Sequence, residues 1–199
     1  MKQENRGLKC PVCESESIQD FFTRENTPIF QNALYKEYSQ AIHAKCDKLD
    51  LKMCSICGMI HNYSFNGSLV DYNTSYENSQ FNSDKAKKYL YEVINIVKNV
   101  YGIHNKTIVE IGCGDGQFLS LLAKETNSKG IGYDPSFSGD LNHLTQNGAD
   151  ITIKTQYFNS DDLPKSIGLL ICRHTIEHIA NPLHFLKNKV TLFIDLTLI

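Results

Sequence analysis

The sequence lacks the features that mark membrane-spanning, secreted or nucleic-acid-binding chains. No apolar run approaches the roughly 20 residues that cross a bilayer, and residues 1–7 are too polar for a secretory signal. Neither sign of charge predominates, because the formal net charge is only −2. Such a balance gives no basic footprint for nucleic acid or for an anionic membrane. We therefore expect a cytoplasmic protein that acts on a small molecule and binds neither nucleic acid nor a membrane.

The composition is otherwise that of an ordinary globular protein. Of the 199 residues, 41% are hydrophobic and 21% are charged, which suits one domain, or one domain plus a small module. Five of the seven cysteines lie in the first 66 residues, and cytoplasmic cysteines more often bind metals or stay as thiols than form disulfides. We predict a first domain at 1–66, a connector rich in Ser, Asn and Tyr at 67–83, and a second domain at 84–199.

From residue 84 onward the apolar pattern predicts alternating helices and strands. Ser83 is a good N-cap for a helix whose apolar positions recur up to Val100 and which Gly102 ends. Further strands are expected at 107–111, 130–134, 151–154, 167–172 and 190–199, and further helices at 117–126, 141–147 and 182–189. This order implies right-handed crossovers and a parallel sheet, with the fully apolar strand at 167–172 in its centre. The predicted fold class is α/β and Rossmann-like.

A glycine-rich loop lies between the first strand of this sheet and the following helix. It reads Glu110-x-Gly112-x-Gly114-x-Gly116, with Cys113 between the first two glycines. Glycines allow a sharp turn and a close approach to a ligand, and the following helix presents free N–H groups. Asp134 ends the next strand, 22 residues after Gly112, where a carboxylate can accept hydrogen bonds from both hydroxyls of a ribose. The pattern predicts a nucleotide-type cofactor site.

The glycine spacing bears on which cofactor binds. Dinucleotide sites have the spacing G-x-G-x-x-G, whereas this loop has G-x-G-x-G preceded by Glu110. That form resembles motif I of the class I S-adenosylmethionine-dependent methyltransferases, and the resemblance covers residues 80–190. It implies S-adenosylmethionine as the cofactor. An NAD-type oxidoreductase and a glycine-rich turn without a ligand stay open as alternatives.

A later segment extends the resemblance. Glu177-His178 precedes Asn181-Pro182, as in the family segment that follows the fourth strand and lines the pocket near the methyl group. The resemblance also implies that the residues after the third strand, Gln156-Tyr157-Phe158, flank the adenine. The predicted cofactor-binding residues are Glu110, Gly112, Cys113, Gly114, Gly116, Asp134, Gln156, Tyr157 and Arg173.

The first domain carries two Cys-x-x-Cys pairs, Cys10 with Cys13 and Cys54 with Cys57. Two such knuckles supply the four sulfurs of a closed, structural zinc site. The 40 residues between the pairs exceed common zinc-ribbon spacing, so residues 14–53 are expected to form an insertion. Three residues could replace one ligand, and four unpaired thiols are the alternative to a metal. The possible replacements are Cys46, His43 and His61.

A two-knuckle domain before such a methyltransferase domain resembles the sugar C-methyltransferases, which act on nucleotide-linked keto-sugars. The resemblance implies His178 as general base, Glu177 as the group that orients it, and Tyr76 near the substrate. Imidazole suits this role because it titrates near neutral pH. The alternatives are that Tyr76, like Tyr72, packs the domain interface, and that His174 and His184 have surface or packing roles.

The sequence departs from the family after Pro182. A complete class I sheet has seven strands and the sugar C-methyltransferases carry a further C-terminal domain, but here at most one strand can follow Pro182. We expect an incomplete sheet with an exposed edge. Three explanations stay open: a fragment, a frameshifted product, or a subunit whose exposed edge a partner chain or oligomer covers. Three functions are weighed: methyl transfer to the carbon or oxygen of a small molecule such as a nucleotide-linked sugar, cofactor binding without turnover, and NAD-type oxidation.

Overall fold

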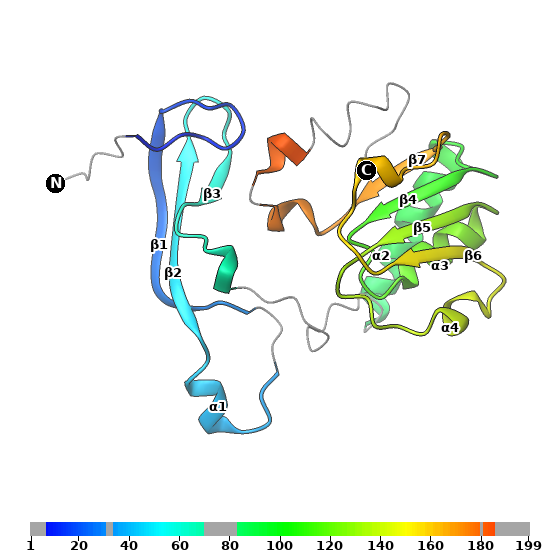
Figure 1. Cartoon of the computed structure of the whole chain (residues 1–199), viewed down its shortest axis with the longest axis horizontal. Coiled ribbons are helices and arrows are strands. Elements are labelled where there is room, and N and C mark those ends of the chain that lie inside the picture. Colours follow the sequence, from blue (N-terminus) through cyan, green and yellow to red (C-terminus); the bar gives the residue numbers. More distant parts are fainter. Residues whose placement is uncertain (1–6, 31–33, 70–82, 180, 186–199) are drawn as a thin grey trace. The chain divides into compact units, whose positions relative to one another are not determined.

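The computed structural model describes residues 7–30, 34–69, 83–179 and 181–185, which form two compact units (Figure 1). The first unit comprises the described residues up to 69 together with 181–185, and the second comprises 83–179. Among the described residues, no helix is long and apolar enough to cross a membrane.

The first unit is a three-stranded antiparallel sheet with the order β1-β2-β3. Its elements are β1 (Ile18–Pro28), α1 (Tyr38–Ile42), β2 (Cys46–Cys54), β3 (Ile60–Asn62) and the 3-10 turn η1 (Gly67–Leu69). The insertion expected between the two cysteine pairs is therefore mainly a long hairpin of β1 and β2, with α1 in its connection. The knuckles lie at the opposite end of this hairpin, because Ile18 pairs with Cys54.

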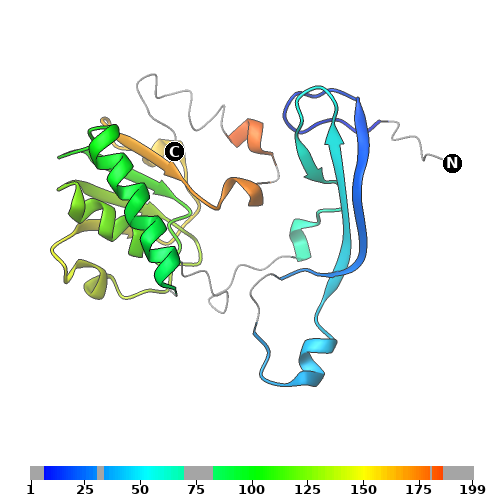
Figure 2. The same cartoon turned by 180° about the vertical axis from the view of Figure 1, so that it is seen from behind.

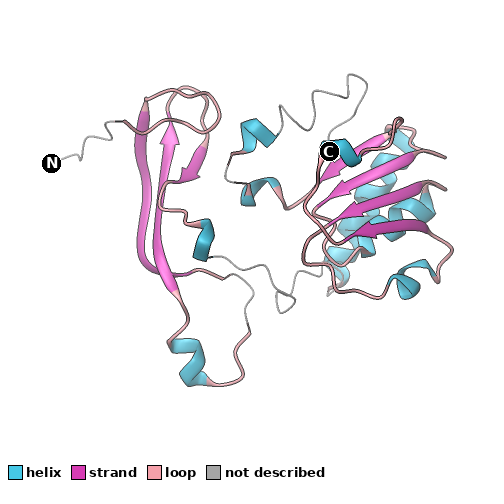
Figure 3. Cartoon of the chain, in the orientation of Figure 1, coloured by secondary structure: helices cyan, strands magenta, loops and turns pink. Residues whose placement is uncertain are grey.

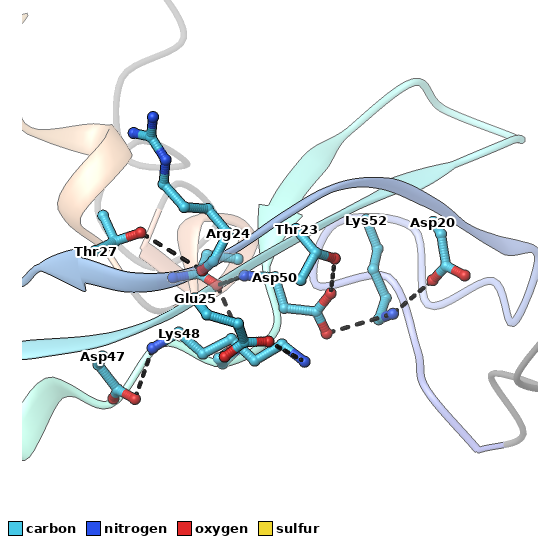
Figure 4. Close-up of polar contacts among 11 residues, drawn as sticks. Asp20, Thr23, Arg24, Glu25, Thr27, Asp47, Lys48, Asp50 and Lys52 are labelled. Atoms are coloured by element: carbon cyan, nitrogen blue, oxygen red, sulfur yellow. Dashed lines mark hydrogen bonds and ion pairs between the residues drawn. The ribbon is translucent and has the colours of Figure 1, made fainter.

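A row of polar side chains crosses one face of this hairpin (Figure 4). The strand register sets Asp20 opposite Lys52 and Thr23 opposite Asp50. The ammonium group of Lys52 lies 2.6 Å from Asp20 Oδ1 and 3.3 Å from Asp50 Oδ2, and the Thr23 hydroxyl donates to Asp50 over 3.1 Å. Cross-strand pairs of opposite charge stabilise a sheet, and a one-residue slip would separate them. The row thus fixes the register of the hairpin.

The second unit contains a parallel sheet with the order β6-β5-β4-β7 (Figure 3). Its strands are β4 (Thr107–Ile111), β5 (Lys129–Tyr133), β6 (Asp150–Lys154) and β7 (Leu169–Cys172). Its helices are α2 (Asp84–Asn95), the π-helical turn η2 (Ile96–Val100), α3 (Gln117–Glu125) and α4 (Leu141–Thr145), and its 3-10 turns are η3 (Ser160–Asp162) and η4 (Ile176–His178). The predicted α/β, Rossmann-like class is confirmed.

The core of this unit lies between the sheet and helices α2 and α3, which share one face of it (Figures 1 and 2). Ile108 of β4 points to this face and is fully buried together with Leu90 of α2 and Leu119 of α3. Side chains alternate along a strand, so Glu110, two residues after Ile108, points to the same face. The sheet thus directs a carboxylate towards the helices at the end where the glycine loop begins.

The helix before β4 begins as predicted but ends differently. The Ser83 hydroxyl accepts a hydrogen bond from the Ala86 N–H over 3.2 Å, which is the expected N-cap. The last five residues form the π-helical turn η2, in which the Tyr101 N–H donates to the Ile96 carbonyl. A turn with i to i+5 bonding is wider than an α-helical one, so the apolar face rotates. Val100, predicted to belong to that face, is 73% exposed.

The position of β7 also differs from the prediction. Within the described part of the chain, β4 has neighbours on both sides, whereas β7 pairs with β4 alone. Leu169, Leu170 and Ile171 are all buried because both faces of β7 are covered, and this coverage accounts for the apolar run that suggested a central strand. The strand predicted at 190–199 lies outside the described residues.

Candidate cofactor site and candidate metal centre

The glycine loop connects β4 to α3, and each of its glycines has a left-handed backbone. The φ angles of Gly112, Gly114 and Gly116 are +70°, +56° and +75°. Packing also excludes larger residues: a Cβ at Gly112 would lie 2.1 Å from the Thr175 hydroxyl oxygen, and one at Gly116 would lie 2.5 Å from Ile153 Cδ1. The Gly112 N–H donates to the Tyr133 carbonyl over 2.8 Å, which ties the loop to the end of β5.

Asp134 follows β5 directly and joins the loop through its side chain. Its Oδ2 accepts a hydrogen bond from the Gly114 N–H over 2.8 Å, and its Oδ1 accepts from the N–H and the hydroxyl of Ser136 over 2.8 and 2.6 Å. The residue is 8% exposed. A carboxylate has about four acceptor positions, so these three bonds leave capacity for a ligand. The structure brings Asp134 to the glycine loop, as the sequence predicts, and gives it a structural role there too.

Glu110 lies beneath the loop and is 3% exposed. Its Oε2 is buried and has no hydrogen-bond partner among the described residues. Burial raises the pKa of Glu110 to about 8, an effect that the positive charge of Arg173 opposes and that Asp115 and Asp134 reinforce. An unpartnered buried carboxyl oxygen is costly, and it points to a ligand that would satisfy it.

Arg173 and Thr175 follow β7 and lie next to the loop. The Arg173 guanidinium carbon lies 3.9 Å from the centre of the Phe118 ring in α3, which is a cation–π contact. The Thr175 hydroxyl donates to the Arg173 carbonyl over 2.9 Å and to the Ile111 carbonyl over 3.3 Å. These contacts hold the segment after β7 against the start of the loop.

Cys113 packs inside the loop. It is 6% exposed, and its sulfur would lie 2.6 Å from a Cβ at Gly132 of β5. Burial and the neighbouring carboxylates of Glu110 and Asp134 raise the pKa of the Cys113 thiol, so it is uncharged at neutral pH. The side chain therefore fills space between the loop and the sheet, and its backbone remains the part suited to a ligand contact.

The residues after β6 divide into a packed and an exposed set. Phe158 meets the buried Tyr133 ring edge-on, with centres 5.2 Å apart, while Tyr157 is 76% exposed. The Gln156 amide donates to Asp162 over 2.8 Å, and the Lys154 ammonium donates to the Tyr133 hydroxyl over 3.1 Å. The aromatic side chain that packs at the end of β5 is thus Phe158, next to the predicted Tyr157.

Two of the three predicted catalytic residues, Glu177 and His178, lie in η4. Glu177 and His178 are exposed, and the His178 N–H donates to the Thr175 carbonyl over 2.9 Å. Glu177 Oε1 lies 3.9 Å from His174 Nδ1. Glu177 therefore has His174 as a neighbour, whereas the predicted partner was His178. Tyr76, like Tyr72, lies outside the described residues.

Sequence reasoning did not identify three residues that shape this site: Thr175, Ser136 and Asp162. Their roles depend on contacts between the ends of neighbouring strands, and no local motif marks them. The clearest available signal was position, since all three follow a predicted parallel strand, and such strand ends meet along one edge of the sheet.

The four predicted metal ligands meet at the end of the hairpin. Their sulfurs all lie within 4.8 Å of one another, with Cys10 and Cys57 at 3.6 Å and Cys13 and Cys54 at 3.5 Å. Zinc–sulfur bonds of about 2.3 Å in a tetrahedron require sulfurs about 3.8 Å apart. The donor set and spacing therefore fit a closed zinc site.

The two knuckles have matching backbones. The Glu14 N–H donates to the Cys10 carbonyl over 3.0 Å, and the Gly58 N–H donates to the Cys54 carbonyl over 2.9 Å. Glu14 and Gly58 both have positive φ, of 61° and 75°. Hydrogen bonds from the backbone of Cys57 and Ile56 lower the pKa of Cys54 to about 6. The chain thus makes the same backbone turn after each pair.

The alternative ligands do not join this group. Cys46 begins β2 and Cys54 ends it, a separation of about 26 Å along a strand. The Cys46 sulfur instead lies 3.3 Å from the Ala44 carbonyl, and His43 bonds to the Ser39 carbonyl. His61 packs edge-on against Tyr63, and burial lowers its pKa.

Comparison with known proteins gives two findings. Residues 81–193 match a family model described as "Methyltransferase domain". A tRNA U34 carboxymethyltransferase of Campylobacter jejuni subsp. doylei is 30% identical over 99 residues, which are 47% of this chain and 34% of that protein. One from Campylobacter jejuni strain RM1221 is 32% identical over 91 residues, 43% of this chain and 31% of that protein. The chain spans about a third of the length of these relatives.

Proposed function

Because the chain belongs to the methyltransferase domain family, we propose that it transfers the methyl group of S-adenosylmethionine to a small-molecule acceptor. The observation that carries this proposal is the left-handed glycine loop between β4 and α3, to which Asp134 is hydrogen-bonded. The cofactor supplies an electrophilic methyl group bound to a sulfonium. The residues around the loop would bind and orient it.

Two carboxyl groups and one stretch of backbone make the site suited to this cofactor. The unpartnered Oε2 of Glu110 is suited to a cationic or hydrogen-bond-donating group, which the cofactor has. The remaining acceptor positions of Asp134 are suited to the ribose hydroxyls. The Gly112–Gly116 backbone leads into the N-terminus of α3, where polar ligand atoms are favoured.

We assign the remaining described residues by their places after β6 and β7, and Tyr76 by the family resemblance alone. Arg173 would contact the cofactor from the end of β7, and Gln156 and Tyr157 would flank the adenine beside Phe158. His178 would take a proton from the acceptor, with Glu177 orienting its imidazole and Tyr76 near the substrate. Carbon methylation α to a carbonyl needs such a base, because that carbon must first lose a proton.

We propose a nucleotide-linked sugar as the acceptor. The support is the four-cysteine unit that precedes the cofactor-binding unit, an order similar to that of the sugar C-methyltransferases. Cofactor binding without turnover, and NAD-type oxidation through the same loop, are the outcomes that would displace this proposal.

A second candidate is carboxymethyl transfer to tRNA. It is favoured by the names of the matching relatives, tRNA U34 carboxymethyltransferases. The net charge of −2 is against it, because binding to a nucleic acid relies on basic groups that neutralise phosphates.

Two measurements test the proposal. Calorimetric titration of the full chain with S-adenosylmethionine and with NAD should give saturable binding of the former only, and preferential NAD binding would overturn it. Formation of S-adenosylhomocysteine is then followed with a nucleotide-linked keto-sugar and with unmodified tRNA. Turnover with the sugar alone supports our choice of acceptor, and modification of the tRNA alone supports the second candidate. Cofactor binding with neither product would identify a binding module.

A further inference from the structure

A second concave site lies at the opposite edge of the parallel sheet from the glycine loop. It is a hollow of about 630 Å³ formed by residues at the amino ends of the strands, including Thr107 of β4, Lys129 of β5 and Asp150 of β6. In Figure 1 this is the edge from which the strand arrows start. Sites for small molecules commonly measure about 300–1,000 Å³, so the hollow has room for one.

Three lysines line this hollow and come from three different segments: Lys106 before β4, Lys124 in α3 and Lys129 in β5. None of the three has an ion-pair partner within the described ranges. Nearby Lys98, by contrast, pairs with Glu125 at 3.4 Å. One carboxylate, that of Asp150, also lines the hollow, which leaves an excess of two positive charges.

Helix α3 accounts for one of these lysines. Its C-terminus lies at this edge, and the last carbonyls of a helix carry a partial negative charge. Lys124 is in the last turn of α3 and offsets that charge. Lys106 and Lys129 do not belong to the helix, and among the described residues Asp150 is the only acidic side chain that lines the hollow with them.

The rim of the hollow is fixed by local hydrogen bonds. Asn105 and Asn127 both have left-handed backbones, with φ of 52° and 49°, and the Asn127 side-chain amide donates to Asn105 Oδ1 over 2.5 Å. The Lys106 N–H donates to the Ser128 hydroxyl over 3.2 Å. Left-handed residues other than glycine are uncommon, and here two of them face each other. The rim is therefore shaped before any ligand arrives, which lowers the cost of binding one.

We propose that this lysine hollow, defined by Lys106, Lys124 and Lys129, binds a phosphorylated small molecule with at least two negative charges. Lysine ammonium groups bind phosphates as point charges, and three exposed lysines line this one hollow. A nucleic acid would instead need a positive track that follows its backbone. The site is independent of the cofactor loop and does not depend on the proposed methyl transfer.

The test is calorimetric titration of the full chain with inorganic tripolyphosphate, with S-adenosylhomocysteine present so that the cofactor loop is not the site measured. We expect saturable binding that Lys129→Gln weakens at least fivefold and that Lys129→Arg retains. Asp150→Asn should strengthen binding, since it removes the opposing charge. Lys88→Gln, which changes an exposed lysine on α2 outside the hollow, should leave the affinity unchanged.

Several results would overturn this assignment. One is the absence of saturable tripolyphosphate binding, and another is an equal loss in Lys129→Gln and Lys88→Gln. A third is a protein that does not bind tripolyphosphate but binds tRNA in a way that depends on Lys129. That result would make the hollow part of a nucleic-acid surface. Thermal denaturation of each variant ensures that a loss of binding is not a loss of folding.

Discussion

Two buried carboxyl groups near the glycine loop differ in their hydrogen bonds. Asp134 accepts three hydrogen bonds at the end of β5, while the buried Oε2 of Glu110 has no partner among the described residues. A buried polar atom without a partner is costly. Asp134 is therefore suited to accept further bonds from ligand hydroxyls, and the Oε2 atom of Glu110 is suited to a ligand group that satisfies it.

Glu110 should make folding stability depend on pH. Its pKa is raised to about 8 in the folded chain by burial, so the stability that its protonation provides is complete below pH 4.5 and is lost as the pH rises through 8. Glutamine does not titrate, so Glu110→Gln removes this dependence. Between pH 4.5 and 8.5 the wild type should lose up to about 5 kcal/mol of its free energy of unfolding relative to the variant.

Urea denaturation at both pH values measures this difference. Glu92→Gln, at an exposed position on α2, is the control and should keep the pH dependence of the wild type. If Glu110→Gln keeps it as well, the carboxyl group is not buried as the structure describes.

Asp134→Asn should weaken cofactor binding by about tenfold or more, since bonds to a charged acceptor contribute about 1.5–3 kcal/mol. The amide has one acceptor oxygen, and its NH₂ group would face either the Gly114 N–H or the groups of Ser136. Titration with S-adenosylmethionine measures the loss. Asp84→Asn, which changes an exposed carboxylate in the first turn of α2, should bind as the wild type does, and equal affinity in the two variants would remove Asp134 from the site.

At the scale of elements, the glycine loop packs on β6 and α4. Two glycine variants separate the energetic contribution of this packing from that of the left-handed backbone. Gly116→Ala places a Cβ 2.5 Å from Ile153 Cδ1 and 2.9 Å from Leu144 Cδ1, at a φ of +75°. Gly148 has a φ of +86° with no atom within 4 Å of such a Cβ. Left-handed backbone costs about 1–2 kcal/mol in both variants, and overpacking adds about 1–3 kcal/mol in Gly116→Ala alone.

Urea denaturation of the two variants gives the comparison. The free energy of unfolding should fall further for Gly116→Ala than for Gly148→Ala. Equal losses would mean that Ile153 and Leu144 move aside without cost.

The polar row of the β1–β2 hairpin predicts a similar contrast. Lys52 is 9% exposed and lies between Asp20 and Asp50, and its hydrogen bond to Asp20 raises its pKa. Lys52→Met leaves two carboxylates near each other and should lower the free energy of unfolding by about 1–3 kcal/mol. Lys48→Met breaks only an exposed pair with Glu25 and should cost less than about 1 kcal/mol. A larger loss at Lys48 would contradict the arrangement in Figure 4.

The elements that the sequence predicts well are those with a strong local pattern. The described strands of the parallel sheet lie within two residues of their predicted bounds, because apolar runs next to glycines leave few alternatives. The π-helical turn at Ile96–Val100 and the hairpin between the cysteine pairs were not predicted. Both depend on pairing and packing with distant residues, and a local pattern does not encode those.

The same division applies to the site. The glycine loop, Asp134 and the four cysteines could be found from spacing, because their chemistry requires fixed separations in the chain. The contact of Thr175 with Gly112, and that of Phe158 with Tyr133, join segments more than 20 residues apart. Such contacts become visible only when the strand order is known.

At the scale of the whole molecule, the two units differ in what stabilises them. Among the described residues, one cluster of fourteen buried hydrophobic residues lies in the second unit, whereas the buried cluster of the first unit has three members, Cys10, Ile18 and Cys54. Small cores commonly need a metal or disulfides. Since two of the three buried residues are predicted zinc ligands, we expect zinc to be required for the first unit to fold.

Chelation of zinc should therefore unfold the first unit and leave the second intact. Elemental analysis should give one equivalent of zinc in the wild type and in Cys46→Ser, whose thiol is at the far end of β2, and less than about half an equivalent in Cys57→Ser. After chelation, proteolysis should cleave within the β1–β2 hairpin, while the affinity for S-adenosylmethionine is retained because its predicted ligands all lie in the second unit. Loss of zinc from Cys46→Ser would move the metal site to other residues. Zinc-free protein with a protease-resistant hairpin would show that the small core is sufficient by itself.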